Sequence, residues 1–209
     1  MTKEIQSVLL YGDSFFWGVN PDTGKRHSSS ERIGKQLQVL LGPDFEVVEE
    51  GHRGRTMFGE NGWFPERDGL AQFGPIFASH LPIHTVVIML GTNDLNTKTL
   101  HSPQDIAAAL TNYQSKMEYW CKFMGYDVPK VIVVAPPDID DTQLDKFKSI
   151  FAASSALIVE LSQELEIQCS KMGYKFLNSA ELVKSIGADG IHISPEDNLR
   201  LATTLKNLI

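Results

Sequence analysis

Short apolar runs alternate along this chain with longer segments in which apolar residues recur every three to four positions. This alternation is typical of a parallel sheet with helices on both faces. Five short runs predict strands, at 7–11, 45–49, 85–90, 130–135 and 174–177. Segments of helical period predict helices at 31–41, 103–123, 147–172 and 195–208. With right-handed crossovers, such strands favour a flavodoxin-like three-layer α/β/α sandwich with a five-stranded parallel sheet in the order 2-1-3-4-5.

The chain has 209 residues, enough for one continuous core but too few for two ordinary domains and a linker. We therefore predict a single domain spanning residues 1–209. Its 42% hydrophobic and 22% charged residues are typical of a soluble globular protein. The net charge of −7, without clustered Lys or Arg, argues against a nucleic-acid partner.

The sequence carries no visible targeting or membrane-spanning signal. Its N-terminal stretch has a short apolar run but neither the hydrophobic region nor the small-residue cleavage site of a signal peptide. No run approaches the roughly 20 apolar residues that a membrane span needs. We therefore expect no membrane partner and a cytoplasmic location.

Cysteines and histidines form no pattern of metal ligands or of a disulfide scaffold. Cys121 and Cys169 lie in separate segments of helical period, which favours reduced, partly buried thiols. His80 and His84 have an i, i+4 spacing, but Pro82 between them breaks the helical geometry that a metal pair would need. We therefore predict no metal and no cofactor.

Three unusual segments follow the first three predicted strands. They read GDSFFWG at 12–18, EGHRGRT at 50–56 and GTNDLN at 91–96. In open parallel sheets the ligand site lies beyond the carboxyl ends of the strands. All three segments should therefore converge at one end of the sheet.

Ser14 comes just after the first predicted strand, where its side chain would point into that crevice. A serine hydroxyl is a poor nucleophile until a neighbouring base removes its proton, and the base is usually a His oriented by a carboxylate. Asp189 and His192 supply both groups close together near the C-terminus. A short turn at Gly190 can bring the carboxylate to Nδ1 of the imidazole while Nε2 faces Ser14.

Acyl transfer also needs hydrogen-bond donors aimed at the oxyanion that develops on the carbonyl oxygen. Gly54 follows the second predicted strand, and its lack of a Cβ lets its backbone N–H approach a substrate. Asn93 follows the third strand and can offer its side-chain amide. With the N–H of Ser14 these make three donors. We interpret Asp13 and Asp94 as structural residues that accept backbone N–H bonds and hold the loops in place.

Taken together, these blocks resemble the ordered motifs of the SGNH (GDSL) hydrolase family: GDS near the N-terminus, a Gly after the second strand, GTND after the third, and DxxH near the C-terminus. They run from Gly12 to His192 and are highly specific in combination. The resemblance implies a flavodoxin-like fold. It also implies a nucleophile at Ser14, an acid and base at Asp189 and His192, and oxyanion donors at Ser14, Gly54 and Asn93.

Within that family, the sequence around these motifs is similar to that of the bacterial arylesterase and acyltransferase (perhydrolase) branch. The similar segments are GDSFFWG at 12–18, FEVVEEG at 45–51, VVIMLGTND at 86–94 and DGIH at 189–192. That branch favours short acyl groups, passes them to alcohols or peroxide as well as water, and forms oligomers. The resemblance therefore implies a small-molecule ester substrate and a homo-oligomer. Phe16 stands where Thr or Ser is frequent, and the pair His52-Arg53 stands where small or apolar residues are usual.

The stretch 53–82 is the least regular part of the chain, because glycines are interleaved with aromatic residues. One interpretation is a loop shaped to cover a pocket or to form a subunit contact. The other is a loop whose aromatic residues complete the core. The residues that we expect to line or border the substrate pocket are Asp13, Phe16, Trp17, His52, Arg53 and Ile191.

The favoured function is that of a serine esterase for short-chain aryl or alkyl esters, acting through an acyl-enzyme and able to transfer the acyl group to alcohols or peroxide. A carbohydrate O-acetylesterase, a lysophospholipase or a thioesterase would use the same residues on a different leaving group. A non-catalytic flavodoxin-like protein could instead hold an anion at the same strand ends without turnover.

Overall fold

The computed structural model describes residues 5–99, 101–144, 146–152 and 154–209. Its centre is a five-stranded parallel sheet with the order β2-β1-β3-β4-β5. The strands are β1 (Gln6–Gly12), β2 (Phe45–Gly51), β3 (Thr85–Met89), β4 (Lys130–Ala135) and β5 (Lys175–Asn178). The predicted fold class and strand order are confirmed.

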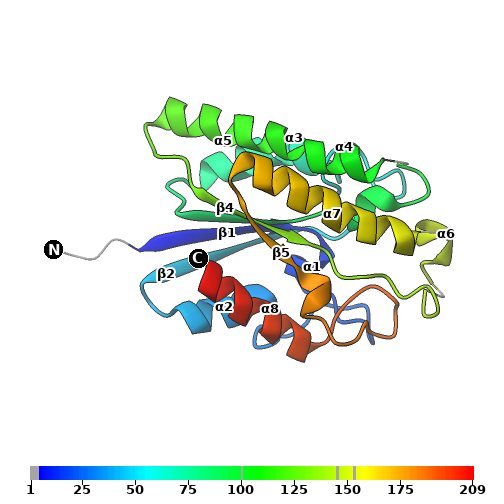
Figure 1. Ribbon diagram of the computed structural model, residues 1–209. Coiled ribbons are helices and arrows are strands. Elements are labelled where there is room, and N and C mark those ends of the chain that lie inside the picture. The colour runs from blue at the N-terminus through cyan, green and yellow to red at the C-terminus, as the bar shows by residue number, and fades with distance from the viewer. Residues whose placement is uncertain (1–4, 100, 145, 153) are drawn as a thin grey trace.

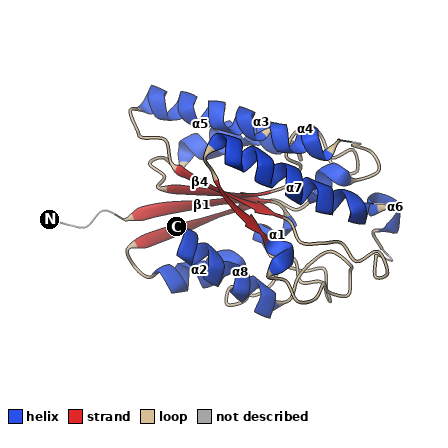
Figure 2. Cartoon of the chain, in the orientation of Figure 1, coloured by secondary structure: helices blue, strands red, loops and turns tan. Residues whose placement is uncertain are grey.

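Helices cover both faces of this sheet (Figure 1). One face packs against α3 (Gly69–Ser79), α4 (Pro103–Ala108), α5 (Leu110–Met124) and α7 (Ser154–Met172). The other packs against α1 (Ser14–Trp17), α2 (Ile33–Leu41) and α8 (Pro195–Leu208). Figure 2 shows the two helical layers with the strands between them. None of the described helices is long and apolar enough to cross a membrane.

The two-sided packing explains why the central strands read as continuous apolar runs. Along β1, Leu9 and Tyr11 belong to the core under α3, α5 and α7, whereas Val8 and Leu10 belong to the core under α2 and α8. All four side chains are fully buried. Successive side chains of a strand point to opposite faces, so a strand covered on both sides has no polar alternation.

Apart from the short α1, which was not predicted, and small shifts of helix ends, the helices depart from the prediction at three places. The predicted helix 103–123 is divided at Ala109 into α4 and α5. The predicted helix 147–172 comprises the short α6 (Lys148–Phe151) and α7, with residue 153 outside the described residues.

The third departure is α3, because the prediction treated 53–82 as irregular throughout. Asp68 caps this helix by accepting the N–H of Ala71 at 3.0 Å, and Pro75 lies inside it. Phe73 and Phe77 lie one turn apart and are both fully buried. Their burial outweighs the hydrogen bond that Pro75 removes. These two aromatics complete the core, whereas Phe64 of the preceding loop stays exposed.

The ends of the first three strands lie side by side. Gly12 at the end of β1 is in register with Gly51 of β2 and with Met89 of β3. The segments that follow these strands therefore leave the sheet at one level, as predicted from the parallel topology.

Candidate active site

The turn after β1 fixes the backbone of Ser14. Asp13 caps the single-turn helix α1 through Oδ1, which accepts the N–H of Phe15 at 3.1 Å. The turn closes at Gly18, whose N–H bonds to the carbonyl of Ser14 at 2.9 Å and whose φ of +86° lies in the left-handed region. Glycine adopts this conformation without strain, so the helix can end after one turn.

Ser14 and His192 meet although they lie 178 positions apart in the sequence. The Nε2 atom of His192 lies 2.8 Å from Oγ of Ser14. The Nδ1 atom lies 2.6 Å from Oδ2 of Asp189. Only 8% of Ser14 and 5% of His192 is exposed, so the contact is largely shielded from water. The structure thus brings together the three residues that the sequence analysis selected.

A tight turn presents the Asp189 carboxylate to the imidazole. Its Oδ1 accepts the backbone N–H groups of Ile191 at 3.0 Å and His192 at 2.9 Å. Gly190 has a φ of +77°, and a Cβ there would lie 2.7 Å from the carbonyl oxygen of Asp140. The position therefore requires glycine on two grounds, backbone conformation and space.

Burial alone would raise the pKa of Asp189, but the hydrogen bond and charge of His192, with the two backbone N–H groups, outweigh it and hold the pKa below its ordinary value. The carboxylate is therefore ionised at neutral pH and accepts the Nδ1 proton. That leaves the lone pair of Nε2 facing the Ser14 hydroxyl. The arrangement can remove the hydroxyl proton when the oxygen attacks a carbonyl carbon.

Two backbone N–H groups of residues near this pair are unengaged. Within the described residues, the N–H groups of Ser14 and Gly54 donate no hydrogen bond. Gly54 has a φ of +77°, and both residues line the same cavity. Free N–H groups at a cavity wall are suited to an oxyanion.

Asn93 also lines this cavity, but its amide is already engaged. Its Nδ2 donates to Oδ2 of Asp13 and to the carbonyl of Arg55, both at 3.1 Å. An oxyanion at this amide would therefore share or replace one of these acceptors. The side chain lies at the cavity, and through these two bonds it also joins the loops that follow β1 and β2.

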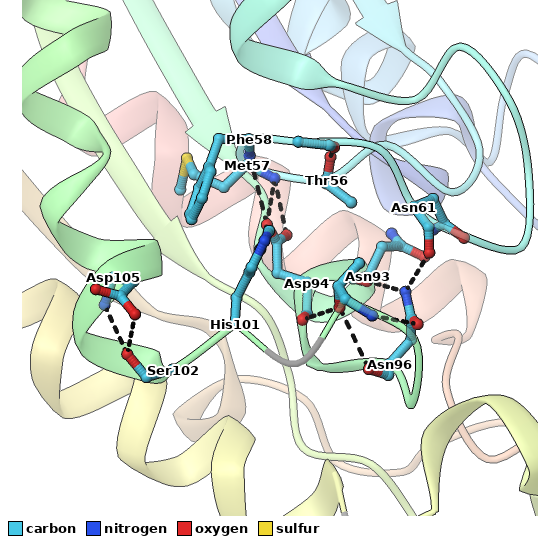
Figure 3. A network of polar contacts seen from close by, with 12 residues as sticks. Thr56, Met57, Phe58, Asn61, Asn93, Asp94, Asn96, His101, Ser102 and Asp105 are labelled. Atoms are coloured by element: carbon cyan, nitrogen blue, oxygen red, sulfur yellow. Dashed lines mark hydrogen bonds and ion pairs between the residues drawn. The ribbon is translucent and has the colours of Figure 1, made fainter.

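Two buried carboxyl groups, those of Asp94 and Asp13, support these loops, and Figure 3 shows the contacts of Asp94. Asp94 accepts the N–H of Met57 at 2.8 and 2.9 Å and that of Phe58 at 3.4 Å. Burial raises the pKa of Asp94, although His101 and the backbone donors oppose the rise. Burial likewise raises the pKa of Asp13 to about 7. Both carboxyl groups accept backbone N–H bonds, the structural role that the sequence predicted.

Asparagine side chains that the sequence analysis did not select extend this network. Asn61 donates from Nδ2 to the carbonyl of Gly54 at 2.8 Å. Asn96 donates from Nδ2 to the carbonyls of Asn61 at 2.9 Å and Asn93 at 2.6 Å, as Figure 3 shows. Both side chains are almost fully buried. Only Asn96 had a sequence signal, since it ends the GTNDLN segment.

The hydroxyl and imidazole open into a cavity of about 280 Å³. Its polar wall consists of Ser14, Gly54, Asn61, Thr92, Asn93 and His192. Its apolar wall consists of Phe64, Phe147, Ile150, Phe151 and Ile191, and two cationic residues, Arg53 and Arg67, complete the lining.

Of the expected pocket residues, Arg53 and Ile191 line the cavity and the other four lie outside its described lining. Phe16 is fully buried in the core under α2 and α8, because the single turn of α1 rotates its ring onto the sheet, where a Cβ at Gly12 would lie 2.6 Å from it. The expectation for Phe16 was therefore wrong.

The remaining three residues occupy positions beneath or beside the cavity. Asp13 accepts hydrogen bonds from the N–H of Phe15 and from the amide of Asn93, which lines the cavity. The ring of Trp17 lies 5.3 Å from the guanidinium of Arg26 and 5.2 Å from that of Arg53. The N–H of His52 donates to the carbonyl of Gly12 at 3.0 Å.

The segment that follows β4 supplies an apolar wall that sequence reasoning missed. It contributes Phe147, Ile150 and Phe151. It also leaves the sheet at the carboxyl end of a strand, so topology alone could have pointed to it. Its residues carry no chemistry, and for that reason no motif drew attention to it.

Comparison with known proteins agrees with this geometry. The model of the GDSL-like lipase/acylhydrolase family matches residues 10–196. The structure of Est24, a carbohydrate acetylesterase from Sinorhizobium meliloti, has 30% sequence identity and a TM-score of 0.91, covering 97% of each chain. The native aryl esterase of M. smegmatis has 31% identity and a TM-score of 0.91, with the same coverage. No curated protein sequence gives a significant match.

Proposed function

The chain belongs to the GDSL-like lipase/acylhydrolase family, and from that premise we propose that it is a serine esterase that hydrolyses short-chain carboxylic esters through an acyl-enzyme on Ser14. The observation that carries the proposal is the 2.8 Å contact between Ser14 Oγ and His192 Nε2, with the imidazole held from its other side by Asp189. The contact lies at the wall of a cavity beside two unengaged backbone N–H groups.

The reaction follows from this arrangement in two steps. Oγ of Ser14 attacks the ester carbonyl carbon while its proton passes to Nε2 of His192, and Asp189 stabilises the imidazolium that forms. The oxyanion accepts hydrogen bonds from the N–H groups of Ser14 and Gly54 and from the Asn93 amide. The alcohol leaves with the proton from Nε2. Water, activated by the same nitrogen, then attacks the acyl-enzyme and releases the acid.

The cavity favours a small acyl group. Its volume of about 280 Å³ lies just below the roughly 300–1,000 Å³ that drug-sized ligands occupy. Its apolar wall suits a short hydrocarbon chain, and an alcohol that partitions onto this wall would compete with water for the acyl-enzyme. We therefore propose acetate to butyrate esters as good substrates, and acyl transfer as a second outcome of the same intermediate.

A carbohydrate O-acetylesterase is the second candidate. One similar structure at 30% identity is a carbohydrate acetylesterase. In this chain Arg53 lines the cavity, and its guanidinium offers hydrogen-bond donors for sugar hydroxyls. Under this alternative the acyl group stays the same and only the leaving alcohol changes.

A fluorophosphonate probe tests the nucleophile. We expect labelling of the wild-type protein, and its loss together with at least a 10⁴-fold fall in kcat, in both Ser14→Ala and His192→Ala. Ser79→Ala is the matched control, because the Ser79 hydroxyl is exposed and bonds only to the carbonyl of Ile76 among the described residues. A folded wild-type protein that is neither labelled nor active would favour an anion-binding protein.

A substrate panel tests the specificity. p-Nitrophenyl esters from acetate to octanoate, with acetylated sugars alongside, should give the highest kcat/KM at acetate to butyrate. A higher kcat/KM on acetylated sugars than on p-nitrophenyl acetate would select the carbohydrate acetylesterase instead.

A further inference from the structure

The peptide bond between Arg53 and Gly54 carries one of the proposed oxyanion donors, the N–H of Gly54. Its carbonyl oxygen, on Arg53, accepts a hydrogen bond from Nε of Arg67 at 2.6 Å. The bond is trans, so its C=O and N–H point in opposite directions. Holding the carbonyl on one side therefore fixes the direction of the N–H on the other.

The carbonyl on the far side of Gly54 is held as well. Nδ2 of Asn61 donates to it at 2.8 Å. The side chain of Arg67 lies beside the glycine, since a Cβ built on Gly54 would be 3.5 Å from Nε of Arg67. Gly54 at a φ of +77° has a wide choice of conformations when unrestrained, and these two contacts restrict it.

Arg67 is itself firmly anchored. Its N–H donates to Oε2 of Glu60 at 3.2 Å, and its carbonyl accepts both the N–H and the hydroxyl of Thr56 at 3.0 Å. Its Nη1 donates to the carbonyls of Pro65 at 2.7 Å and Glu66 at 3.3 Å. Glu66 has a φ of +57°, a strained conformation that persists only where surrounding contacts enforce it. Both the main chain and the guanidinium of Arg67 are therefore held by the residues around them.

The partners of the guanidinium are unusual for a cation. Each hydrogen bond that its side chain makes to a described residue goes to a main-chain carbonyl, and none goes to a carboxylate. A charged donor on a peptide oxygen polarises the whole peptide, and so strengthens the N–H at its other end as a donor. Arg67 also lines the cavity that contains Ser14 and His192.

We propose that Arg67 is a positioning residue for acyl transfer at Ser14: through the Arg53 carbonyl it aims the Gly54 N–H at the oxyanion and strengthens it as a donor. The inference rests on the proposed esterase function. It assigns Arg67 to the transition state, where charge develops on the carbonyl oxygen, and gives it no contact with the substrate in the ground state.

Kinetics of Arg67→Ala with p-nitrophenyl acetate test this assignment. Loss of a whole oxyanion donor lowers kcat by about 10²–10³. A donor that is misaligned but still present should cost less, so we expect roughly a 10- to 100-fold fall in kcat with KM within about threefold. Phenylboronic acid forms a tetrahedral adduct on the serine, and its affinity should weaken by the same factor as kcat/KM. Millimolar methylguanidinium should restore part of kcat.

Arg26→Ala is the matched control. Nε of Arg26 also donates to a main-chain carbonyl, that of Trp17 at 2.7 Å, so this variant loses the same charge and the same kind of bond outside the cavity lining. Its kcat and boronate affinity should equal those of the wild type. An equal fall in kcat in Arg26→Ala and Arg67→Ala would overturn the assignment.

Further outcomes separate positioning from folding and from substrate binding. An Arg67→Ala protein that melts as the wild type does and keeps kcat within twofold refutes the proposal, as does a raised KM at unchanged kcat. If Arg67→Ala does not fold, the same two measurements on Arg67→Lys test the proposal. Parallel losses of kcat and of affinity for phenylboronic acid support the role, and an unchanged affinity for phenylboronic acid refutes it. A wild-type protein that hydrolyses no ester would refute the proposed function itself, whereas wild-type turnover with an unaffected Arg67→Ala overturns this inference alone.

Discussion

Replacing Asp189 with Asn should stop the reaction by reversing the imidazole tautomer. In the structure, Oδ1 of Asp189 accepts two backbone N–H groups and Oδ2 faces Nδ1 of His192. An Asn oxygen would keep the two backbone donors, because an NH₂ group in that place would lose both bonds. The NH₂ group would then face Nδ1, which can accept its hydrogen only when unprotonated. The ring proton would therefore lie on Nε2 and point at Ser14.

The expected cost is large. A wrong tautomer in a serine, histidine and aspartate arrangement lowers kcat by about 10⁴, or about 5 kcal/mol of transition-state stabilisation. KM should change little, since Asp189 is outside the described lining of the cavity. The assay is kcat for p-nitrophenyl acetate at pH 7, with ¹⁵N NMR of the imidazole nitrogens to report which one carries the proton.

Asp140→Asn serves as the control, because it removes a carboxylate from the same turn region. The backbone N–H of Asp140 donates to the carbonyl of Gly190 at 2.9 Å, but its carboxylate accepts hydrogen bonds only from Thr142 and Gln143 among the described residues. It should keep wild-type kcat. The reasoning is refuted if Asp189→Asn retains kcat within tenfold of the wild type, or if its imidazole remains protonated on Nδ1.

Further expectations concern the buried carboxyl group, the amide donor and the apolar wall. Burial raises the pKa of Asp13 from its usual value near 3.8 to about 7. Between those two pH values the folded protein keeps the proton that the unfolded chain has lost, so stability falls as pH rises, by up to about 1.4 kcal/mol per pH unit. Urea unfolding from pH 4.5 to 7 should show this fall in the difference between wild type and Asp13→Asn, and parallel curves would contradict it. Asn93→Ala should lower kcat by about 10²–10³ with KM within about threefold, whereas a raised KM at unchanged kcat would assign Asn93 to substrate binding. Phe151→Ala should raise kcat/KM for octanoate relative to acetate by roughly tenfold, and an unchanged ratio over the ester panel would place the acyl chain elsewhere.

The sheet and the meeting of Ser14 with His192 could be predicted because both follow from long-range regularities. Parallel strands separated by helices place their carboxyl ends at one edge, so residues after β1 and β3 and near the C-terminus share a site whatever their distance in sequence. The turn at Gly190 could be predicted from local sequence, because a glycine in the left-handed conformation brings the Asp189 carboxylate back to His192.

The environment of the site could not be predicted in the same way. Whether Phe16 faces the cavity or the core depends on how one helical turn rotates over the sheet, and its neighbours in sequence do not encode that rotation. The helix α3 was missed because Pro75 and two glycines mask a pattern that only burial of Phe73 and Phe77 makes stable. Arg67 and Asn61 bond to backbone carbonyls, and no residue spacing in the sequence signals such contacts.

The proposed oxyanion donor and most of the apolar wall lie on different loops, and this affects which substitutions should change the rate and which the acyl-chain preference. Gly54, the proposed donor, and its anchors Asn61 and Arg67 belong to the segment between β2 and α3, which also carries Phe64 of the apolar wall. The other aromatic residues of that wall, Phe147 and Phe151, follow β4 together with Ile150. Substitutions in the first segment should act on the charge that develops in the transition state, and substitutions in the second on the space for the acyl chain. Because Phe147, Ile150 and Phe151 lie on a different loop from Gly54, we expect substitutions after β4 to change the acyl-chain preference without disturbing the proposed oxyanion donors, and Arg67, which we propose acts through a main-chain carbonyl, to affect the rate.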